Sequence, residues 1–143
     1  MRFPSREWCE ALAAALLRDA SAVDAAAGFG PVVAGIVIEK GGGLEEDFCV
    51  LFRAAPGEGV ELDFPEDEDE LEELEPDYIA WAAYPLCKAL LEDARRGGRP
   101  DALRAILERR VRLQGDLERL VRHAGRHHGA GLEAIRAIPT EFV

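Results

Sequence analysis

The chain has 143 residues, a length typical of one domain that buries a sizeable core. Its formal net charge of −11 argues against a nucleic-acid-binding protein, since such proteins neutralise phosphates with basic residues. No apolar run approaches the length of about 18 residues that spans a bilayer, so no stable membrane insertion is expected. Cys9, Cys49 and Cys87 lack any CxxC spacing and lie in apolar patterns, which predicts reduced thiols in a cytoplasmic protein.

Two helices are predicted at the start of the chain. The first should begin after Ser5, because Trp8, Leu12 and the apolar residues that follow lie on one helical face. A second, shorter helix should begin in "SAVD" at Ser21, which has the capping-box spacing, and Gly28 fits its C-terminal cap.

Three strands follow, and they predict an antiparallel meander. The stretch "PVVAGIVIE" is almost continuously apolar, as in a central strand buried on both faces. "FCVLFRA" places Phe48, Val50 and Phe52 on one side of the next strand, and "VELDF" alternates apolar and acidic residues. The triple glycine 41–43 between the first two strands precedes three acids, so it predicts a hairpin loop rather than a phosphate site.

The charge is unevenly spread along the chain. Residues 1–87 hold 20 acids and 5 bases, whereas residues 88–143 hold 8 acids and 12 bases. Eight of the acids fall between Glu66 and Glu75, interrupted by Leu71 and Leu74. Because such a run repels itself, we expect an acidic, solvated loop or mobile helix at 65–77; the alternative is an acidic docking motif for a partner.

The second half adds two strands and several helices. "DYIAWAA" predicts a fourth strand with Ile79 and Trp81 on one face, and Pro85 and Pro100 each open a helix. The fifth strand, in "RVRLQ", turns at Gly115 into a helix that Asp116 should cap. Since a carboxylate already accepts the free N–H groups of that helix start, a phosphate site there is disfavoured. Residues 117–138 read as one long helix, or as two joined near the glycines at 125, 129 and 131.

No set of catalytic side chains can be assembled from the sequence. His123 and His127 are four residues apart, a spacing that zinc sites use, but no third ligand is evident nearby. His128 falls on the apolar stripe of the last helix and is interpreted as a satisfied or partly buried histidine that could meet a polar headgroup. We therefore predict a protein that is not an enzyme and has neither metal nor cofactor.

The order of elements resembles the sterol carrier protein 2 family of small α+β lipid-binding domains, and most of all its bacterial single-domain members. The resemblance covers nearly the whole chain, and its most specific pieces are "LQGDL" at 113–117 and "IPTEF" at 138–142. It implies a mixed, mostly antiparallel five-stranded sheet covered by about five helices, a single domain over 1–143, and a last helix that helps to close a lipid tunnel. Trp81 stands where the family often has a glycine, so it could fill space that a lipid occupies in relatives.

The predicted function is non-enzymatic binding or transfer of a hydrophobic ligand, a fatty acyl chain, a sterol-like molecule or another lipid, by a monomer or a homodimer. Two alternatives stay open: a protein-interaction module that docks through the acidic run, and an accessory to an acyl-thioester enzyme that uses His128. The expected ligand-binding residues are the inward apolar positions Phe48, Val50, Phe52, Ile79, Trp81, Leu86, Leu90, Leu103, Ile106, Leu117, Val121 and Ile135.

Overall fold

The computed structural model describes residues 1–127 and 129–143. Its main sheet has five strands: β2 (Val32–Glu39), β3 (Phe48–Ala55), β4 (Gly59–Asp63), β5 (Tyr78–Ala83) and β6 (Val111–Gln114). They lie in the order β4-β3-β2-β5-β6, and only β2 and β5 are parallel. The predicted meander and the mixed, mostly antiparallel sheet are both confirmed.

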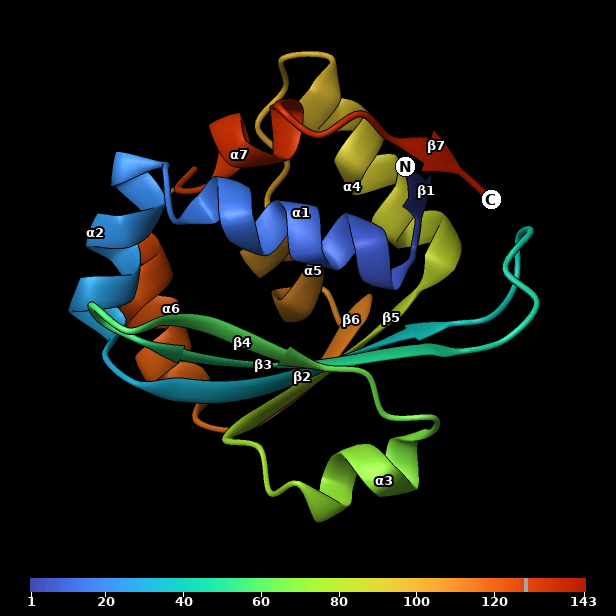
Figure 1. Ribbon diagram of the computed structural model, residues 1–143, viewed down its shortest axis with the longest axis horizontal. Coiled ribbons are helices and arrows are strands. Elements are labelled where there is room, and N and C mark those ends of the chain that lie inside the picture. The colour runs from blue at the N-terminus through green and yellow to red at the C-terminus, as the bar shows by residue number, and fades with distance from the viewer. Residues whose placement is uncertain (128) are drawn as a thin grey trace.

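Seven helices are found in the described part of the chain, not the expected five or so: α1 (Arg6–Leu16), α2 (Ala20–Phe29), α3 (Glu68–Glu73), α4 (Tyr84–Arg95), α5 (Ala102–Leu107), α6 (Leu117–Arg126) and α7 (Leu132–Arg136). In Figure 1, α1, α4, α5 and α7 lie over one face of the sheet, α2 and α6 flank it, and α3 lies alone across the other face. None of these helices is long and apolar enough to cross a membrane.

The position of α3 follows from the strand order. The chain leaves β4 at one edge of the sheet and must reach β5, which pairs with β2 on its far side. A connection of that kind has to cross one face of the sheet, and α3 lies on this crossover (Figure 1). Of the two forms predicted for the acidic segment 65–77, loop or helix, its middle is a short helix, capped by the carboxylate of Asp67.

The caps of the first two helices are partly as predicted. Ser5 caps α1, since its hydroxyl accepts the N–H of Trp8 at 3.1 Å. For α2 the cap is Asp19 rather than Ser21, because the Asp19 carboxylate accepts the N–H of Ser21 at 3.0 Å. The same helix ends at Gly30, which has the left-handed φ of 88° that favours glycine, rather than at Gly28.

A second, two-stranded sheet joins the two ends of the chain, and the sequence did not predict it. Strand β1 (Arg2–Phe3) pairs in parallel with β7 (Glu141–Phe142), and Figure 1 shows both termini there. The indole of Trp8 donates to the Thr140 hydroxyl at 3.0 Å, and the Tyr84 hydroxyl donates to the Val143 carbonyl at 2.9 Å. The last residues of the chain, 138–143, are thus bound to both α1 and α4.

The corner between β6 and α6 has the predicted geometry. Gly115 has φ 135°, and a Cβ there would lie 2.4 Å from Cδ1 of Tyr78. Asp116 caps α6 by accepting the N–H of Arg119 at 3.1 Å. The stretch that follows forms two helices, α6 and α7, which confirms the second of the two interpretations; His128 lies outside the described residues.

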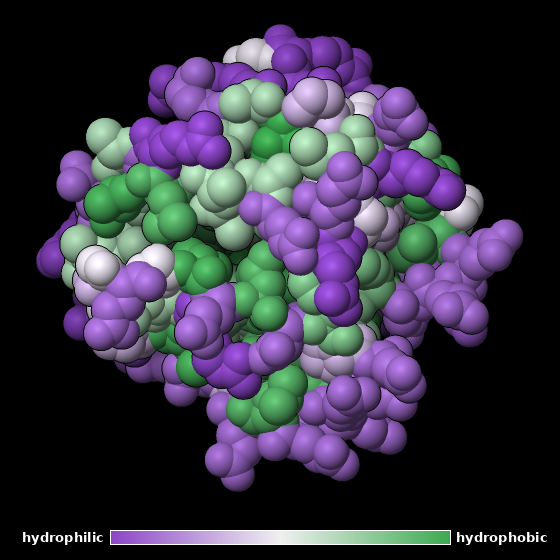
Figure 2. Space-filling model, viewed as in Figure 1, coloured by the Kyte–Doolittle hydropathy of each residue, from purple (hydrophilic) through white to green (hydrophobic). Residues whose placement is uncertain are grey.

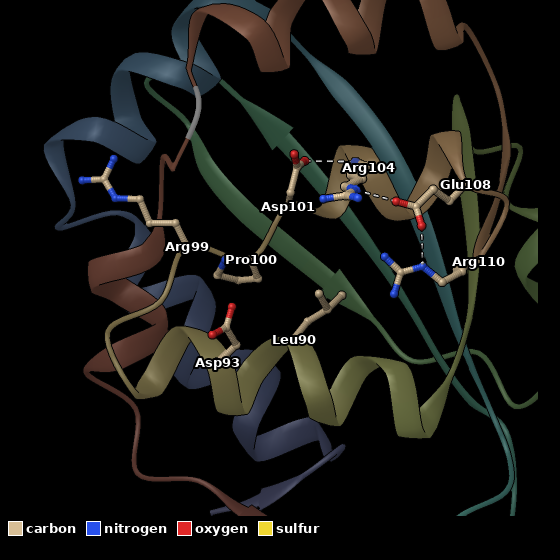
Figure 3. Close-up of a pocket in the computed structure, with 8 residues that line it drawn as sticks. All are labelled: Leu90, Asp93, Arg99, Pro100, Asp101, Arg104, Glu108 and Arg110. Atoms are coloured by element: carbon tan, nitrogen blue, oxygen red, sulfur yellow. Dashed lines mark hydrogen bonds and ion pairs between the residues drawn. The ribbon is translucent and has the colours of Figure 1, made fainter.

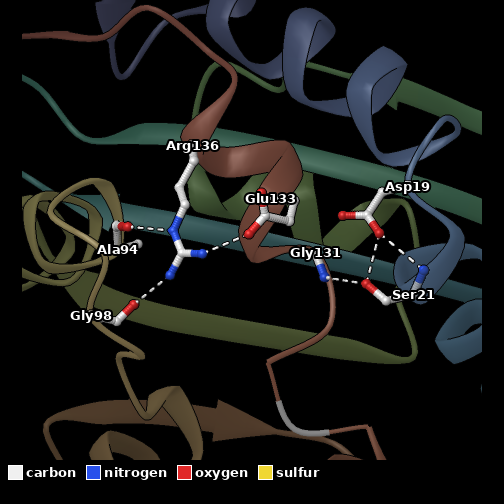
Figure 4. Close-up of polar contacts among 7 residues, drawn as sticks. All are labelled: Asp19, Ser21, Ala94, Gly98, Gly131, Glu133 and Arg136. Carbon is white, nitrogen blue, oxygen red and sulfur yellow. Dashed lines mark hydrogen bonds and ion pairs between the residues drawn. The ribbon is translucent and has the colours of Figure 1, made fainter.

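Polar contacts hold α7 in place (Figure 4). The guanidinium of Arg136 donates to the carbonyls of Ala94 and Gly98, each at 2.8 Å, and pairs with Glu133 at 2.7 Å. Arg136 therefore adds a second hydrogen bond to the Ala94 carbonyl, which also accepts the N–H of Gly97 at 3.2 Å, and fixes the loop after α4.

Candidate ligand-binding site

The strand register divides the predicted ligand residues between two faces of the sheet. Partners in neighbouring strands share a face, and Phe48, Val50 and Phe52 pair with residues 38, 36 and 34 of β2 on the face under α1 and α4. Ile79 and Trp81 pair with residues 35 and 37, which lie on the α3 face. The prediction that all five line one ligand space is therefore wrong for Ile79 and Trp81.

The α3 face is closed. Leu71 of α3 has 0% of its surface exposed and packs in one cluster with Leu51, Ile79 and Trp81. Gly35 of β2 makes this possible, since a Cβ at that position would lie 2.8 Å from Cδ1 of Leu71. Trp81 completes this cluster and does not fill any space under the helices.

The other face, under the six remaining helices, is closed only at one end. Phe3, Trp8, Ile38, Tyr84 and Ile138 form a buried cluster between α1, α4 and the terminal strands. Phe48 packs against the edge of this cluster. The aromatic ring of Phe3 lies edge-on to that of Trp8, with centroids 4.8 Å apart, so this end is a tightly packed core.

The rest of that face is unevenly covered. Ala34 and Val50 are buried, and Ile36 packs against the edge of the cluster. Ile36, Phe52 in β3 and Ala80 in β5 are nevertheless only half-buried although helices lie above them. The predicted helix residues are half-buried as well: Leu86, Leu90, Leu103, Ile106, Val121 and Ile135. In Figure 2, apolar residues are exposed in the region between α1 and the sheet.

Two residues stand at the margin of this layer. Leu17, just after α1, is 53% exposed beside the turn that leads into β4. Leu117 is 40% exposed in the first turn of α6, directly after the Asp116 cap, so its expected inward position is wrong.

An open hollow of about 500 Å³ lies between α4 and α5 (Figure 3). Its lining comprises Leu90, Asp93, Arg99, Pro100, Asp101, Arg104, Glu108 and Arg110. Glu108 pairs with Arg104 at 2.5 Å and with Arg110 at 3.5 Å, while Asp101 caps α5. With three acids balancing three bases, this hollow suits water and polar groups, and only Leu90 belongs to the predicted ligand set.

A second open hollow, of about 320 Å³, lies between α2 and α6. Its lining carries Arg119, Arg122, Arg126, His123 and His127, and no described carboxylate lines it. The sequence contains a signal for this basic cluster, because these residues recur at spacings of three and four, but a metal-site interpretation of the two histidines leaves out the arginines.

None of the three cysteine thiols is activated as a nucleophile. Burial raises the pKa of Cys9 to about 12 and the pKa values of Cys49 and Cys87 to about 11, so all three thiols stay protonated at neutral pH. Across residues 1–127 and 129–143, no group of three His, Cys, Asp or Glu side chains is placed to hold a metal ion.

No protein-family model matches the sequence, and no curated protein matches it. Two solved structures share the architecture. The crystal structure of sterol carrier protein 2 superimposes with a TM-score of 0.67 at 14% identity, covering 94% of this chain and 98% of that one. The solution structure of a conserved hypothetical protein from Thermus thermophilus, suggested to be a sterol carrier protein, gives 0.67 at 13% identity, covering 96% and 90%. The chain therefore has the sterol carrier protein fold, as the sequence resemblance implied.

Proposed function

We propose that the protein binds one hydrophobic ligand, a fatty acyl chain or another lipid, between the helix-covered face of its sheet and the helices above, without catalysing a reaction. The proposal rests on the unequal burial of the two faces of the sheet. Val37 and Leu51 are completely buried on the α3 face, whereas Ile36 and Phe52, their neighbours in the same strands, are half-buried under the helices. Residues of central strands are normally buried on both faces, so apolar surface is left for a ligand to cover.

The energetics favour a chain-like ligand. Each methylene group that leaves water contributes about 0.8 kcal/mol, so an acyl chain would bind without any specific polar motif. The fold supports this reading, since one structural neighbour is a sterol carrier protein by name. Without Ile79, Trp81 and Leu117, the proposed ligand residues are Phe48, Val50, Phe52, Leu86, Leu90, Leu103, Ile106, Val121 and Ile135.

Two alanines of β5 provide the test. Ala80 is half-buried opposite Ile36, and Ala82 is buried opposite Ile38; both lie on the helix-covered face. Ala80→Phe should fill ligand space and displace at least about two methylene groups, which lowers the affinity for a fluorescent fatty acid about tenfold. Its free energy of unfolding should change by less than about 1 kcal/mol, whereas Ala82→Phe should overpack the core and cost about 1–3 kcal/mol.

The outcome separates a ligand space from a filled core. If Ala80→Phe destabilises the protein as much as Ala82→Phe and leaves fatty-acid uptake unchanged, the space above Ala80 is already filled and the proposal fails. Urea unfolding monitored by circular dichroism gives the stabilities, and fluorescence titration gives the affinities.

An interaction module remains the second candidate, because the acids of the 66–75 run are exposed or half-buried while Leu71 alone in it is buried. Deleting the run would also remove Leu71 and uncover the α3 face. Replacing Glu70, Glu72 and Glu73 by glutamine keeps Leu71 and is therefore the cleaner test. If the acidic run is a docking motif, this variant should no longer capture a protein partner. Its lipid uptake should be unchanged. Leu71 can then be varied separately.

A further inference from the structure

The hollow between α2 and α6 concentrates positive charge on a strongly acidic protein. The chain carries a formal net charge of −11, yet three arginines and two histidines line this hollow of about 320 Å³. From α2 the lining receives only Gly28 and Phe29, neither of which is ionisable. The hollow is therefore positive on its α6 side and apolar on its α2 side.

The three arginines differ in the contacts that their guanidinium groups make. Arg119 donates to the carbonyl of Phe29, and its guanidinium lies 4.2 Å from the centre of the Phe29 ring, so it is fixed at the end of α2. Arg122 and Arg126 are one helical turn apart and exposed, and neither forms an ion pair with a carboxylate of the described residues. The helix dipole accounts for a basic residue at Arg126 in the last turn of α6, but not for Arg122 in its middle.

The two imidazoles lie between these guanidinium groups. The rings of His123 and His127 are 4.6 Å apart, and the His123 ring lies edge-on to Phe29 at 4.9 Å. Burial lowers the pKa of His123, and the nearby His127, Arg119 and Arg126 lower it further. No acid on α2 or α6 lines the hollow to oppose this effect, so a bound anion would supply the missing negative charge.

We propose that this hollow binds a phosphate group, either on a free anion or on the headgroup of an amphipathic lipid. Arg122 and Arg126, which form no ion pair with the described part of the chain, present planar donor pairs that match phosphate oxygens, and the imidazoles add further donors. The site goes beyond the proposed lipid space, because Val121, a residue of the proposed ligand set, lies on the opposite side of α6 from its arginines and histidines. A concave hollow fits a small anion better than it fits a flat membrane surface.

The test uses inorganic pyrophosphate as the probe, at low ionic strength and near-neutral pH. Arg122→Gln/Arg126→Gln should weaken pyrophosphate binding, measured by calorimetry, at least about tenfold, since charge-assisted hydrogen bonds are lost. The control is Arg2→Gln/Arg96→Gln, which removes the same charge at exposed positions outside both hollows and should bind like the unmodified protein. Equal weakening in both double variants would overturn the proposal, because it would reflect only the net charge.

A second readout reports on the site itself. NMR of its ring protons measures the pKa of His123. Saturating pyrophosphate should raise this pKa in the unmodified protein and in the control, but not in Arg122→Gln/Arg126→Gln. An unchanged His123 titration in the unmodified protein would contradict the proposal even if weak binding were detected.

The source of the phosphate is then distinguished by competition. If oleoyl lysophosphatidate displaces pyrophosphate far better than glycerol 3-phosphate does, the bound phosphate belongs to a lipid headgroup. If the two compete equally, it belongs to a free anion. Either result supports the site. Binding only to phosphatidylserine vesicles, with no soluble phosphate bound, would overturn it in favour of a membrane surface. Uptake of a neutral fluorescent sterol should be the same in the arginine variant, which separates this site from the proposed lipid space.

Discussion

The two faces of the sheet are closed by very different means. One short, acidic helix closes the α3 face, because Leu71 fits over Gly35 and leaves Val37, Leu51 and Ile79 almost without solvent contact. Six helices lie over or beside the other face, yet Ile36 remains half-buried in the central strand. The number of covering elements therefore does not decide whether a face is filled; the fit of individual side chains does.

The largest effect expected from this comparison is in β3, where Leu51 and Phe52 are adjacent and lie on opposite faces. Leu51→Ala should lower the free energy of unfolding by about 2–5 kcal/mol, because Leu51 is completely buried. Phe52→Ala removes a larger side chain but should cost only about 1–2 kcal/mol, since part of its surface is already in contact with solvent. Urea unfolding of the ligand-free protein measures both, and a greater loss for Phe52→Ala would contradict the comparison.

A smaller but still clear loss is expected at the helix that closes the α3 face. Leu71→Ala should cost about 2–4 kcal/mol, whereas Leu74→Ala, three residues further on at a 37% exposed position, should cost less than about 1 kcal/mol. Gly35→Ala should be destabilising alone, because its new methyl group meets Leu71, and less so combined with Leu71→Ala. Additive costs in this double-mutant cycle would show that residues 35 and 71 do not depend on each other.

The smallest effect concerns the rates of thiol alkylation. Cys49 is buried in the closed cluster and Cys87 is half-buried under the helices, and burial raises the pKa of each thiol from 9.0 to about 11. Alkylation by iodoacetamide should therefore accelerate as the pH rises from 9 towards 11, as thiolate forms. The stabilisation that each protonated thiol gives is present below pH 9 and is lost over the same interval.

The two cysteines should also differ from each other. Cys87 should react before Cys49, and Leu71→Ala should accelerate Cys49 alone because it opens the α3 face. Mass spectrometry of tryptic peptides follows each site separately. Equal rates for Cys49 and Cys87 in the unmodified protein would show that the α3 face opens as readily as the other.

Local features of the fold could be predicted from the sequence because local chemistry determines them. The corner at Gly115 and Asp116 needs only a residue with positive φ and a carboxylate cap, and both are visible in "QGDL". The terminal strands β1 and β7 could not be predicted, since two-residue strands have no periodicity. Their pairing depends on contacts between the two ends of the chain.

The candidate site was harder to predict, for two physical reasons. Alternation along β5 shows that Ile79 and Trp81 share a face, but not that this face lies under α3; only the pairing with Gly35 and Val37 decides that. Leu71 and Leu74 are spaced as on one helical face, yet the surrounding acids led to the expectation of a solvated segment. The phosphate hollow likewise depends on the contact between α2 and α6, which are far apart in the sequence.

Native mass spectrometry of the freshly purified protein tests directly whether the helix-covered face holds a lipid. We expect a species heavier than the chain by the mass of one lipid. This added mass should be lost on organic extraction and restored by adding a fatty acid, and it should be restored only weakly in Ala80→Phe. A protein of the bare chain mass that also takes up no fatty acid or sterol would contradict this expectation.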